Sequence, residues 1–489
     1  MLSVLVFLPL AFALIIMLIA RHDAALSRYL ALGGSVLTVL VALYVAVRFN
    51  FDGPGFQFQE KYPWLPPIGA SYHLGLDGLS LLLVALTVIV TPVAILVADQ
   101  SVAERVPLYM ALVMLLETSL LGVFVSLDLV LFYLFWEGVL IPAYLLIGVW
   151  GGERRIYAAL KYVIYTMLGS LLMLAGVVGV YVYSTAHSFD IPALIAAPTS
   201  PSLQTPLLIA FGLAFAIKAA LWPFHSWVPD VYTESATPTT ILLAGVVSKM
   251  GVYGFLRIVL PMFPQAMRTL SVVAATLAVI GILYGALLAL TQWDAKRLVA
   301  CSSISHMGLI LLGVFALNMQ GVQGATIQMV NHGIITAALF AIVGAIAWRW
   351  GTTDLRRLGG LGHRALVLAA IFSVVALAAL GLPGLNSFAG EFLILLGAFR
   401  SSAAYGVFGT LGVILAAWYM LRLFQGAMQG PAVAGLDRPA HGVALRTNEL
   451  LALLPLVGLI VWIGVAPGGW LYAAASAARA IVGAVGGAQ

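Results

Sequence analysis

Residues 211–251 read FGLAFAIKAALWPFHSWVPDVYTESATPTTILLAGVVSKMG. Two lysines, Lys218 and Lys249, stand inside apolar runs of this stretch, and Pro223 lies between them in a shorter, more polar segment. Ionisable side chains at the depth of a bilayer are rare and usually functional. Because proline in a membrane helix leaves a backbone carbonyl to be satisfied by neighbours or water, we expect a broken, hydrated helix here.

The composition of the whole chain is that of a polytopic membrane protein. Of its 489 residues 63% are hydrophobic and 8% are charged, which leaves almost nothing for a soluble domain. About 20 apolar residues cross a ~30 Å hydrocarbon core, and runs of this length predict an all-α fold of about fourteen transmembrane helices. The expected spans are residues 2–20, 29–48, 77–98, 106–126, 128–149, 159–183, 206–233, 239–261, 270–290, 298–318, 322–348, 366–399, 403–427 and 449–473. The first span lacks a preceding basic region, so we expect it to be retained and not cleaved as a signal.

A second proline interrupts the twelfth expected span. Pro383 lies in ALAALGLPGLNSFAGEF, 160 residues after Pro223. Paired interrupted helices in two halves of a chain indicate inverted repeats around a pathway near the midplane. For either break alone, a plain kink without function is the alternative. The expected units are residues 1–105 with three helices and an outer loop, repeats of five helices at 106–261 and 262–427, and 428–489 with the last helix.

The loop charges predict the orientation. The side that holds the loop after the first span collects Arg21, Arg28, Arg105, Arg154, Arg155, Lys161, Lys296, Arg297, Arg349, Arg356, Arg357, Arg364, Arg422, Arg438 and Arg446. The opposite side has only Arg48, Lys61, Arg257, Arg268, Arg400 and Arg479. The positive-inside rule then places both termini on the outer face of a bacterial cytoplasmic (inner) membrane. The polar segment 49–76 falls on that face, and we expect an ordered cap there.

Further ionisable residues stand inside expected spans. Glu137 follows Asp128 by nine residues, about 14 Å along a helix, and so lies near the midplane. Glu391 follows Pro383 by eight residues in the second broken helix. His306 and His332 stand on the tenth and eleventh spans, and Glu117 on the fourth is a less certain candidate.

These residue types suit the transfer of protons. A nearby carboxylate keeps a desolvated lysine protonated, and loss of that negative charge lets the lysine release its proton. A neutral imidazole takes or gives a proton near physiological pH. The structural alternatives are static ion pairs, hydrogen bonds that tie helices together, and snorkelling of Lys218 to an interface. We expect the relay to consist of Glu137, Lys218, Lys249, His306, His332 and Glu391.

Several other chemistries are disfavoured. Cys301 is the single cysteine, which excludes disulfides, cysteine-ligated zinc and iron–sulfur clusters on this chain. We find no credible dinucleotide fingerprint and no metal-ligand spacing. The net charge of +5 reflects basic loops and not a nucleic-acid partner. A haem carrier with His306 and His332 as axial ligands is the remaining redox alternative, but it leaves the buried lysines unexplained.

The motifs FYLFWEGVLIPAYLLIGVWGG, KAALWPFHSWVPDVYTESATPT, VSKMGVYGFLR, SSISHMG, NHGIITAALF and GLPGLNSFAGEF resemble those of the proton-pumping, antiporter-like subunits of respiratory complex I. The resemblance covers residues from about 105 to 425, and it favours the M-type (chain 4) branch, because L- and N-type subunits usually carry lysine where Glu391 stands. It implies that Glu137 and Lys218 form the first buried pair, that Lys249 is the central relay, that His306 and His332 bridge, and that Glu391 is the exit. It also implies L- and N-type subunits as partners, with NADH, FMN, iron–sulfur clusters and quinone bound elsewhere and no cofactor here.

Two relatives of similar sequence stay open. One is a subunit of a multisubunit Na⁺/H⁺ antiporter, although Glu391 argues against its lysine-bearing members. The other is the corresponding chain of the photosynthetic, ferredoxin-dependent complex. The sequence leaves open which quinone the complex uses, whether Na⁺ replaces H⁺, and the order of gating.

Overall fold

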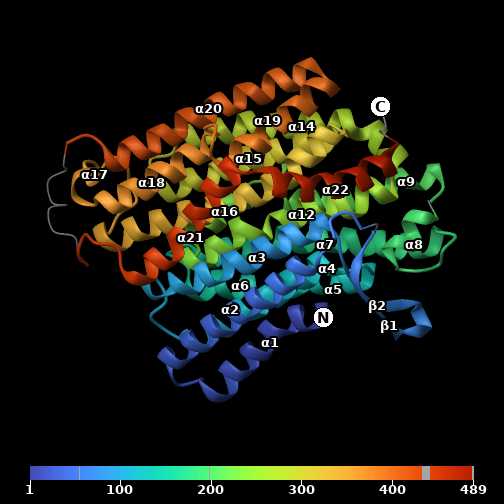
Figure 1. The fold of residues 1–489 in the computed structure, drawn as a ribbon, viewed down its shortest axis with the longest axis horizontal. Coiled ribbons are helices and arrows are strands. Elements are labelled where there is room, and N and C mark those ends of the chain that lie inside the picture. The colour runs from blue at the N-terminus through green and yellow to red at the C-terminus, as the bar shows by residue number, and fades with distance from the viewer. Residues whose placement is uncertain (54, 198, 432–440, 487–489) are drawn as a thin grey trace.

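The structure is a computed structural model that describes residues 1–53, 55–197, 199–431 and 441–486. Its long helices run side by side along the longest axis of the molecule (Figure 1). Among the described residues, thirteen helical segments are long and apolar enough to cross a membrane, judged by length and composition. The remaining expected crossing, residues 366–399, is divided between the shorter helices α18 (Leu366–Ala379) and α19 (Asn386–Ser401). The predicted all-α membrane fold is confirmed.

The other elements follow in chain order. The first are α1 (Leu2–Ile19), α2 (Ala24–Arg48), β1 (Gln57–Leu65), β2 (Ala70–Leu76), α3 (Gly78–Leu96), α4 (Val106–Val125), α5 (Leu129–Gly138), α6 (Leu140–Trp150) and α7 (Arg155–Tyr183). Next come α8 (Ile191–Ala196), α9 (Pro201–Lys218), α10 (Trp227–Glu234), α11 (Thr237–Leu242), α12 (Lys249–Gly254) and α13 (Leu260–Met262). The last are α14 (Pro264–Thr291), α15 (Ala295–Phe315), α16 (Met319–Trp350), α17 (Leu361–Arg364), α20 (Ala403–Met428), α21 (Thr447–Val465) and α22 (Gly468–Val485). Short 3₁₀ turns lie at Pro66–Ile68 and Ala98–Gln100, and π-helical turns at Leu243–Val247 and Phe255–Val259.

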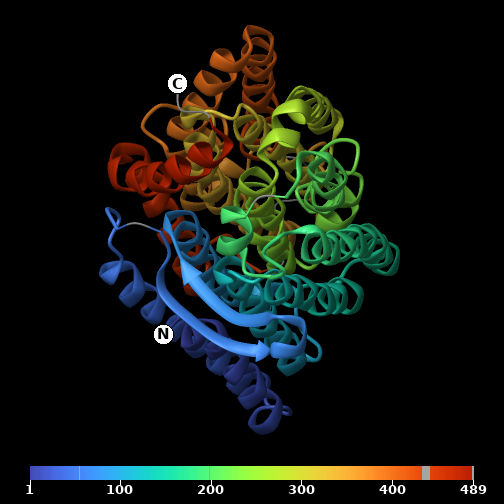
Figure 2. The same ribbon diagram turned by 90° about the vertical axis from the view of Figure 1, so that its right-hand side faces the viewer.

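Three crossings form the centre of the bundle. The most apolar windows of Thr237–Met262, α15 and α16 are 100% buried inside the molecule, whereas those of α1 and α2 are 33% buried. A helix that is apolar all round and buried on every side belongs to the core. Figure 2 looks onto the end that carries the β-strands and shows the N-terminal helices at the bottom and the orange helices near residue 400 at the top. The three central helices carry Lys249, His306 and His332, so the fold places these residues at the greatest depth.

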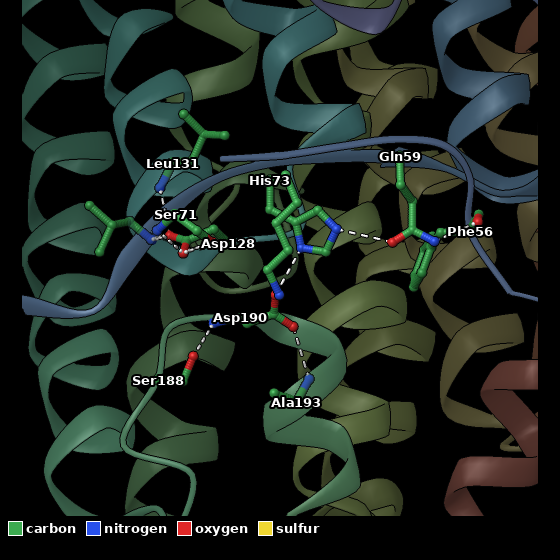
Figure 3. Close-up of polar contacts among 11 residues, drawn as sticks. Phe56, Gln59, Ser71, His73, Asp128, Leu131, Ser188, Asp190 and Ala193 are labelled. Carbon is green, nitrogen blue, oxygen red and sulfur yellow. Dashed lines mark hydrogen bonds and ion pairs between the residues drawn. The ribbon is translucent and has the colours of Figure 1, made fainter. Parts of the chain in front are cut away.

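The strands β1 and β2 form an antiparallel hairpin at one end of the helices, which we call the hairpin end. The hairpin is anchored through polar contacts with the start of α5 and α8 (Figure 3). Asp128 caps α5 and accepts hydrogen bonds from the backbone and hydroxyl of Ser71 at 2.9 and 3.0 Å. Asp190 caps α8 and lies 2.8 Å from Nδ1 of His73. The polar segment expected to form an ordered cap is therefore a hairpin bound to two helix N-termini.

The opposite end, which we call the basic end, holds the loops that the charge pattern groups together. Arg28 donates to the carbonyl of Val102, Gly152 to that of Glu234, and Ala295 to that of Thr353. Arg349 and Glu449 form an ion pair of 2.5 Å with side chains that are 0% and 1% exposed, which joins α16 to α21. Arg438, one of the counted basic residues, lies outside the described residues.

One expected helix boundary and one expected loop residue need correction. The last expected span, 449–473, is divided: α21 ends at Val465, and Pro467 precedes a separate helix, α22. The fifth expected span is a single crossing, Leu129–Trp150, in which Val139 separates α5 from α6. Arg257, which the charge count assigns to the outer loops, is buried within its span at 5% exposure. The predicted interruptions are confirmed between α9 and α10 and between α18 and α19.

Candidate functional site

The first buried lysine stands where its helix stops. Lys218 is the last residue of α9 and is 2% exposed. Its Nζ atom donates a hydrogen bond to the hydroxyl of Tyr162 at 3.0 Å and lies 5.5 Å from the ring centroid of Trp136. The indole of Trp227 donates to the carbonyl of Ile217 at 2.9 Å, so the first turn of α10 satisfies a carbonyl that the break frees. The break is therefore an ordered structure built around the lysine.

Glu137 is near Lys218 but does not touch it. It lies at the end of α5, and its side chain is partly buried. Its charge acts on Lys218 by Coulomb attraction, yet among the described residues no ion pair within 4.0 Å joins the two side chains. The hydroxyl of Tyr162 occupies the position next to the ammonium group, and the pairing of Glu137 with Lys218 stays a prediction.

The second lysine stands beside a π-helical turn. Lys249 is 0% exposed and directly follows the turn Leu243–Val247, which Ser248 closes with an i to i−5 hydrogen bond to Leu243 at 3.2 Å. Its Nζ donates to the carbonyl of Ala244 at 2.5 Å and lies 2.8 Å from Nδ1 of His332. Widened turns of this kind are frequent at functional sites. Here the turn presents a backbone carbonyl to a buried ammonium group and directs that group at an imidazole.

The predicted histidines connect Lys249 to Glu391. The rings of His332, on α16, and His306, on α15, have centroids 5.5 Å apart. His306 Nδ1 is 3.7 Å from Oε1 of Glu391, and its Nε2 is 3.1 Å from the hydroxyl of Tyr419 on α20. Lys249, His332, His306 and Glu391 therefore form one line from the first half of the chain to the second. We call these four residues the central line.

Glu391 lies in a polar network at the second break. It is 5% exposed, and its Oε1 accepts hydrogen bonds from the Ser387 hydroxyl at 2.9 Å and from the Gln328 amide at 3.2 Å. Gln328 also donates to Ser387 at 2.6 Å. The carboxyl group is therefore held on the side of α19 that faces α16.

Two small cavities adjoin the central line, each of about 10 Å³. One is lined by His306 and Glu391 among other residues. The other is lined by His306, His332, Gln328 and Ser387 among others. A volume of this size holds about one water molecule when polar groups surround it. Such a water would connect the groups that are too far apart for a direct hydrogen bond.

Glu117 is not part of this line. It lies on α4, is 0% exposed, and neither carboxyl oxygen has a hydrogen-bond partner among the described residues. A buried carboxylate without a hydrogen-bond partner is costly. Among the described residues, no hydrogen bond or ion pair connects Glu117 to the residues of the expected relay.

The geometry argues against the haem alternative. His306 directs one nitrogen at Glu391 and the other at Tyr419, while Nδ1 of His332 faces Lys249. Only Nε2 of His332 lacks a partner within the described residues. The ring centroids of His306 and His332 are 5.5 Å apart, and three of the four ring nitrogens face other side chains. The two imidazoles therefore do not present a pair of free nitrogens to one iron.

Sequence reasoning missed the neutral partners of the charged residues. Gln328 had a usable signal, since it precedes His332 by four residues and so shares its helix face. Tyr162 and Tyr419 had none, because tyrosines are ordinary within membrane spans and their partners lie on other helices.

Residues 126–416 match the family described as "NADH:quinone oxidoreductase/Mrp antiporter, TM". The chain belongs to this family. The match includes every residue of the central line and both broken helices, and it leaves Glu117 outside.

Relatives within this antiporter family extend the match to nearly the whole chain. NADH-quinone oxidoreductase subunit M of Rhodobacter capsulatus is 42% identical over 482 residues, covering 96% of this chain and 93% of the relative. The protein of the same name from Rickettsia prowazekii (strain Madrid E) is 38% identical over 470 residues, with 95% of each covered. A chain of respiratory complex I from Thermus thermophilus superposes with a TM-score of 0.91 at 33% identity, covering 100% of both chains.

The fold is also shared outside complex I. A chain of the Mrp complex from Dietzia sp. DQ12-45-1b has a TM-score of 0.85 at 24% identity. This likeness shows the fold alone. The similarity to the complex I chain and to subunit M shows that this chain is a membrane subunit of a larger complex.

Proposed function

We propose that this chain is the M-type membrane subunit of a bacterial proton-translocating NADH:quinone oxidoreductase and that it carries protons while other subunits perform the redox reaction. The observation that carries the proposal is the central line, in which three fully buried helices and one broken helix bring Lys249, His332, His306 and Glu391 within proton-transfer reach. The relatives of similar length and name support the same assignment.

Protons enter from the basic end and leave toward the hairpin end in this proposal. The excess of basic residues at one end makes that end cytoplasmic by the positive-inside rule. Both termini and the hairpin then lie on the outer side of the inner membrane. The repeats at 106–261 and 262–427, each with one broken helix, supply the inlet at Lys218 and the outlet at Glu391.

Lys218 is loaded first. Its ammonium group is stabilised by the negative charge of Glu137 and by the hydroxyl of Tyr162. When Glu137 loses its charge or moves away, desolvation favours the neutral amine, and the proton leaves toward Lys249. Between the two lysines lie the rings of Tyr162, Trp227 and Tyr232, in edge contacts of 5.5 and 6.0 Å, so this step needs a movement that admits water.

Lys249 passes the proton along the central line. Its ammonium group is 2.8 Å from Nδ1 of His332, so neutral His332 is the acceptor. A water in the cavity between His332 and His306, and a second beside Glu391, would complete the route to the carboxyl group. Glu391 then releases the proton toward the outer side. FMN, iron–sulfur clusters and quinone belong to other subunits in this proposal, and L- and N-type subunits are the neighbours.

The experiment replaces Lys249 by methionine, which keeps the length of the stem and removes the charge. We expect the purified complex to assemble and to lose proton release coupled to NADH oxidation in proteoliposomes. A parallel assay with Na⁺ tests the antiporter alternative. Full pumping by the assembled Lys249→Met complex contradicts the proposal.

A further inference from the structure

A second buried cation stands on the helix that carries Lys249, eight residues nearer the hairpin end. Arg257 is 5% exposed. Its Nη2 atom is 2.5 Å from Oδ1 of Asp77 and 3.2 Å from the hydroxyl of Ser80, and its Nε donates to the hydroxyl of Tyr253 at 3.2 Å. The guanidinium also lies 4.8 Å from the ring centroid of Phe56, in the connection that precedes β1. Arg257 is therefore held in one position between Lys249 and the hairpin end.

Tyr253 lies between the two cations along the helix, and other aromatic rings pack in a layer with it. Tyr253 lies one turn beyond Lys249, and its ring is 5.3 Å from that of Phe124 and 6.4 Å from that of Phe132. Phe215 packs against Phe132 with ring centroids 6.2 Å apart. The hydroxyl of Tyr253 donates to the backbone carbonyl of Phe124 at 3.0 Å, so its proton is already committed. This layer has few groups that could pass a proton toward the hairpin end.

The charge of Arg257 adds to the obstacle. A guanidinium keeps its charge at every physiological pH, and in a medium of low dielectric constant it repels another cation far more strongly than in water. A fixed arginine excludes protons from other membrane pores in this way. Asp77 is anchored by the backbone N–H of Ser80 at 2.9 Å, and its negative charge makes the burial of Arg257 tolerable.

We propose that Arg257, positioned by Asp77 and Tyr253, is an electrostatic barrier that stops protons on Lys249 from leaking directly to the outer side. The inference rests on the proposed function and explains why the proton on Lys249 moves toward His332 and not straight to the outer side. With the straight route closed, the titratable group within hydrogen-bond distance of Lys249 among the described residues is the imidazole of His332, which leads sideways to the second half. A static ion pair that only ties α3 to the helix of Lys249 is the competing reading.

The test measures passive proton permeability of the intact complex in proteoliposomes, with an imposed pH gradient and no NADH. We expect Arg257→Gln to raise the leak on the order of tenfold and Arg257→Lys, which keeps the charge, to leave it at the parental rate. The double variant Asp77→Asn with Arg257→Gln removes both charges and should leak as well. This double variant replaces Arg257→Gln in the test if the single variant does not assemble. Arg268→Gln, at the same end but exposed and bound to the carbonyl of Val485, is the matched control without a leak.

Adding Lys249→Met to Arg257→Gln should abolish the extra leak, because the leak passes through Lys249. An assembled Arg257→Gln complex that stays tight overturns the barrier, as does an equal leak in Arg257→Lys or a leak that survives Lys249→Met. These outcomes are separate from the proposed function, whose failure appears as full pumping by Lys249→Met alone.

Discussion

The two interrupted helices hold their ionisable residues in different surroundings. Within the described residues, Lys218 donates only to the Tyr162 hydroxyl, and its Nζ atom lies 5.2 and 5.5 Å from the ring centroids of Tyr162 and Trp136. Glu391 accepts from Ser387 and Gln328 and lies 3.7 Å from His306, with a cavity beside it. The first break isolates its charged residue, whereas the second places its residue in a network.

This difference assigns different tasks to two breaks of similar design. A buried ammonium group with a single hydrogen-bond partner and aromatic neighbours is suited to hold a proton until a nearby charge changes. A carboxyl group in a hydrogen-bonded network with room for water is suited to pass a proton on. At the second break, a substitution should therefore act by removing the group that passes the proton on. At the first break, it should act by removing the positive charge that holds the proton.

Glu391→Gln tests the network at the second break and should have the largest effect. The amide keeps a carbonyl oxygen that accepts from Ser387 and Gln328, but it cannot carry the proton. We expect coupled proton release to fall on the order of tenfold or more, the usual cost of losing a proton-transfer group. The measurement is the ratio of protons released to NADH oxidised in proteoliposomes. Ser387→Ala, which removes one hydrogen bond only, is the control, and parental pumping by an assembled Glu391→Gln complex contradicts the role.

Lys218→Met and Tyr162→Phe together test the isolation of the first break. Loss of the ammonium group should lower coupled pumping several-fold to about tenfold. Loss of the hydroxyl removes one hydrogen bond to a charged group, worth about 2 kcal/mol, and should give a smaller decrease because Glu137 still attracts the ammonium group. The measurement is the initial rate of NADH-driven acidification. Equal effects of the two substitutions would mean that Tyr162 takes part in transfer itself.

The sequence predicted the breaks and the charged residues for simple physical reasons. Apolar runs of bilayer length define spans, proline interrupts them, and an ionisable residue at the middle of a span is conspicuous. It did not predict the π-helical turn before Lys249, since no residue type marks such a turn. The division at Pro467 had a signal, because proline followed by two glycines ends a helix, but hydropathy alone carried the expected span past it.

The partners of the charged residues could not be predicted in the same way. Tyr162 and Lys218 are 56 residues apart, and His306 and Tyr419 are 113 residues apart. Each pair depends on which helices lie side by side, and the pattern of apolar residues does not specify that. Glu137 shows the same limit, because the sequence identifies it as an ionisable residue within a span but does not show that Tyr162 lies next to the Lys218 ammonium group.

Gly251 tests how closely the first break must approach the helix of Lys249. A Cβ atom at Gly251 would lie 2.4 Å from the carbonyl oxygen of Phe215 and 2.6 Å from the amide of Ala219. Both atoms belong to the backbone of α9 and its break, so they cannot move aside cheaply. We expect Gly251→Ala to destabilise the subunit by about 2 kcal/mol and to lower the thermal stability of the complex. Gly458→Ala, where nothing lies within 4 Å of the new atom, is the control and should be neutral.

The hairpin end offers the smallest test, because it lies outside both breaks. Burial alone would raise the pKa of Asp190. Hydrogen bonds with His73 at 2.8 Å and Lys61 at 2.5 Å outweigh this effect and lower the pKa to about 2. The Gln59 amide donates to the Phe56 carbonyl, which leaves its oxygen as the acceptor for Nε2 of His73. His73 therefore bridges Asp190 and Gln59, with Nδ1 2.8 Å from the Asp190 carboxylate and Nε2 3.1 Å from the Gln59 oxygen.

The sign of the pH effect follows from this pKa. The pKa of Asp190 in the folded state lies below the usual 3.8, so its contribution is present above pH ~4 and is lost as the pH falls toward ~2. After allowance for solvent screening we expect about 1 kcal/mol. Asp190→Asn should loosen residues 57–76 at pH 7, and its difference from the parent should shrink with acidification. Hydrogen exchange of the hairpin amides, corrected for intrinsic rates, measures this. Asp23→Asn removes the charge of the carboxylate that caps α2 at the basic end and should leave the hairpin unchanged. A constant difference between Asp190→Asn and the parent down to the lowest pH would show that the Asp190 carboxylate holds the hairpin by shape and not by charge.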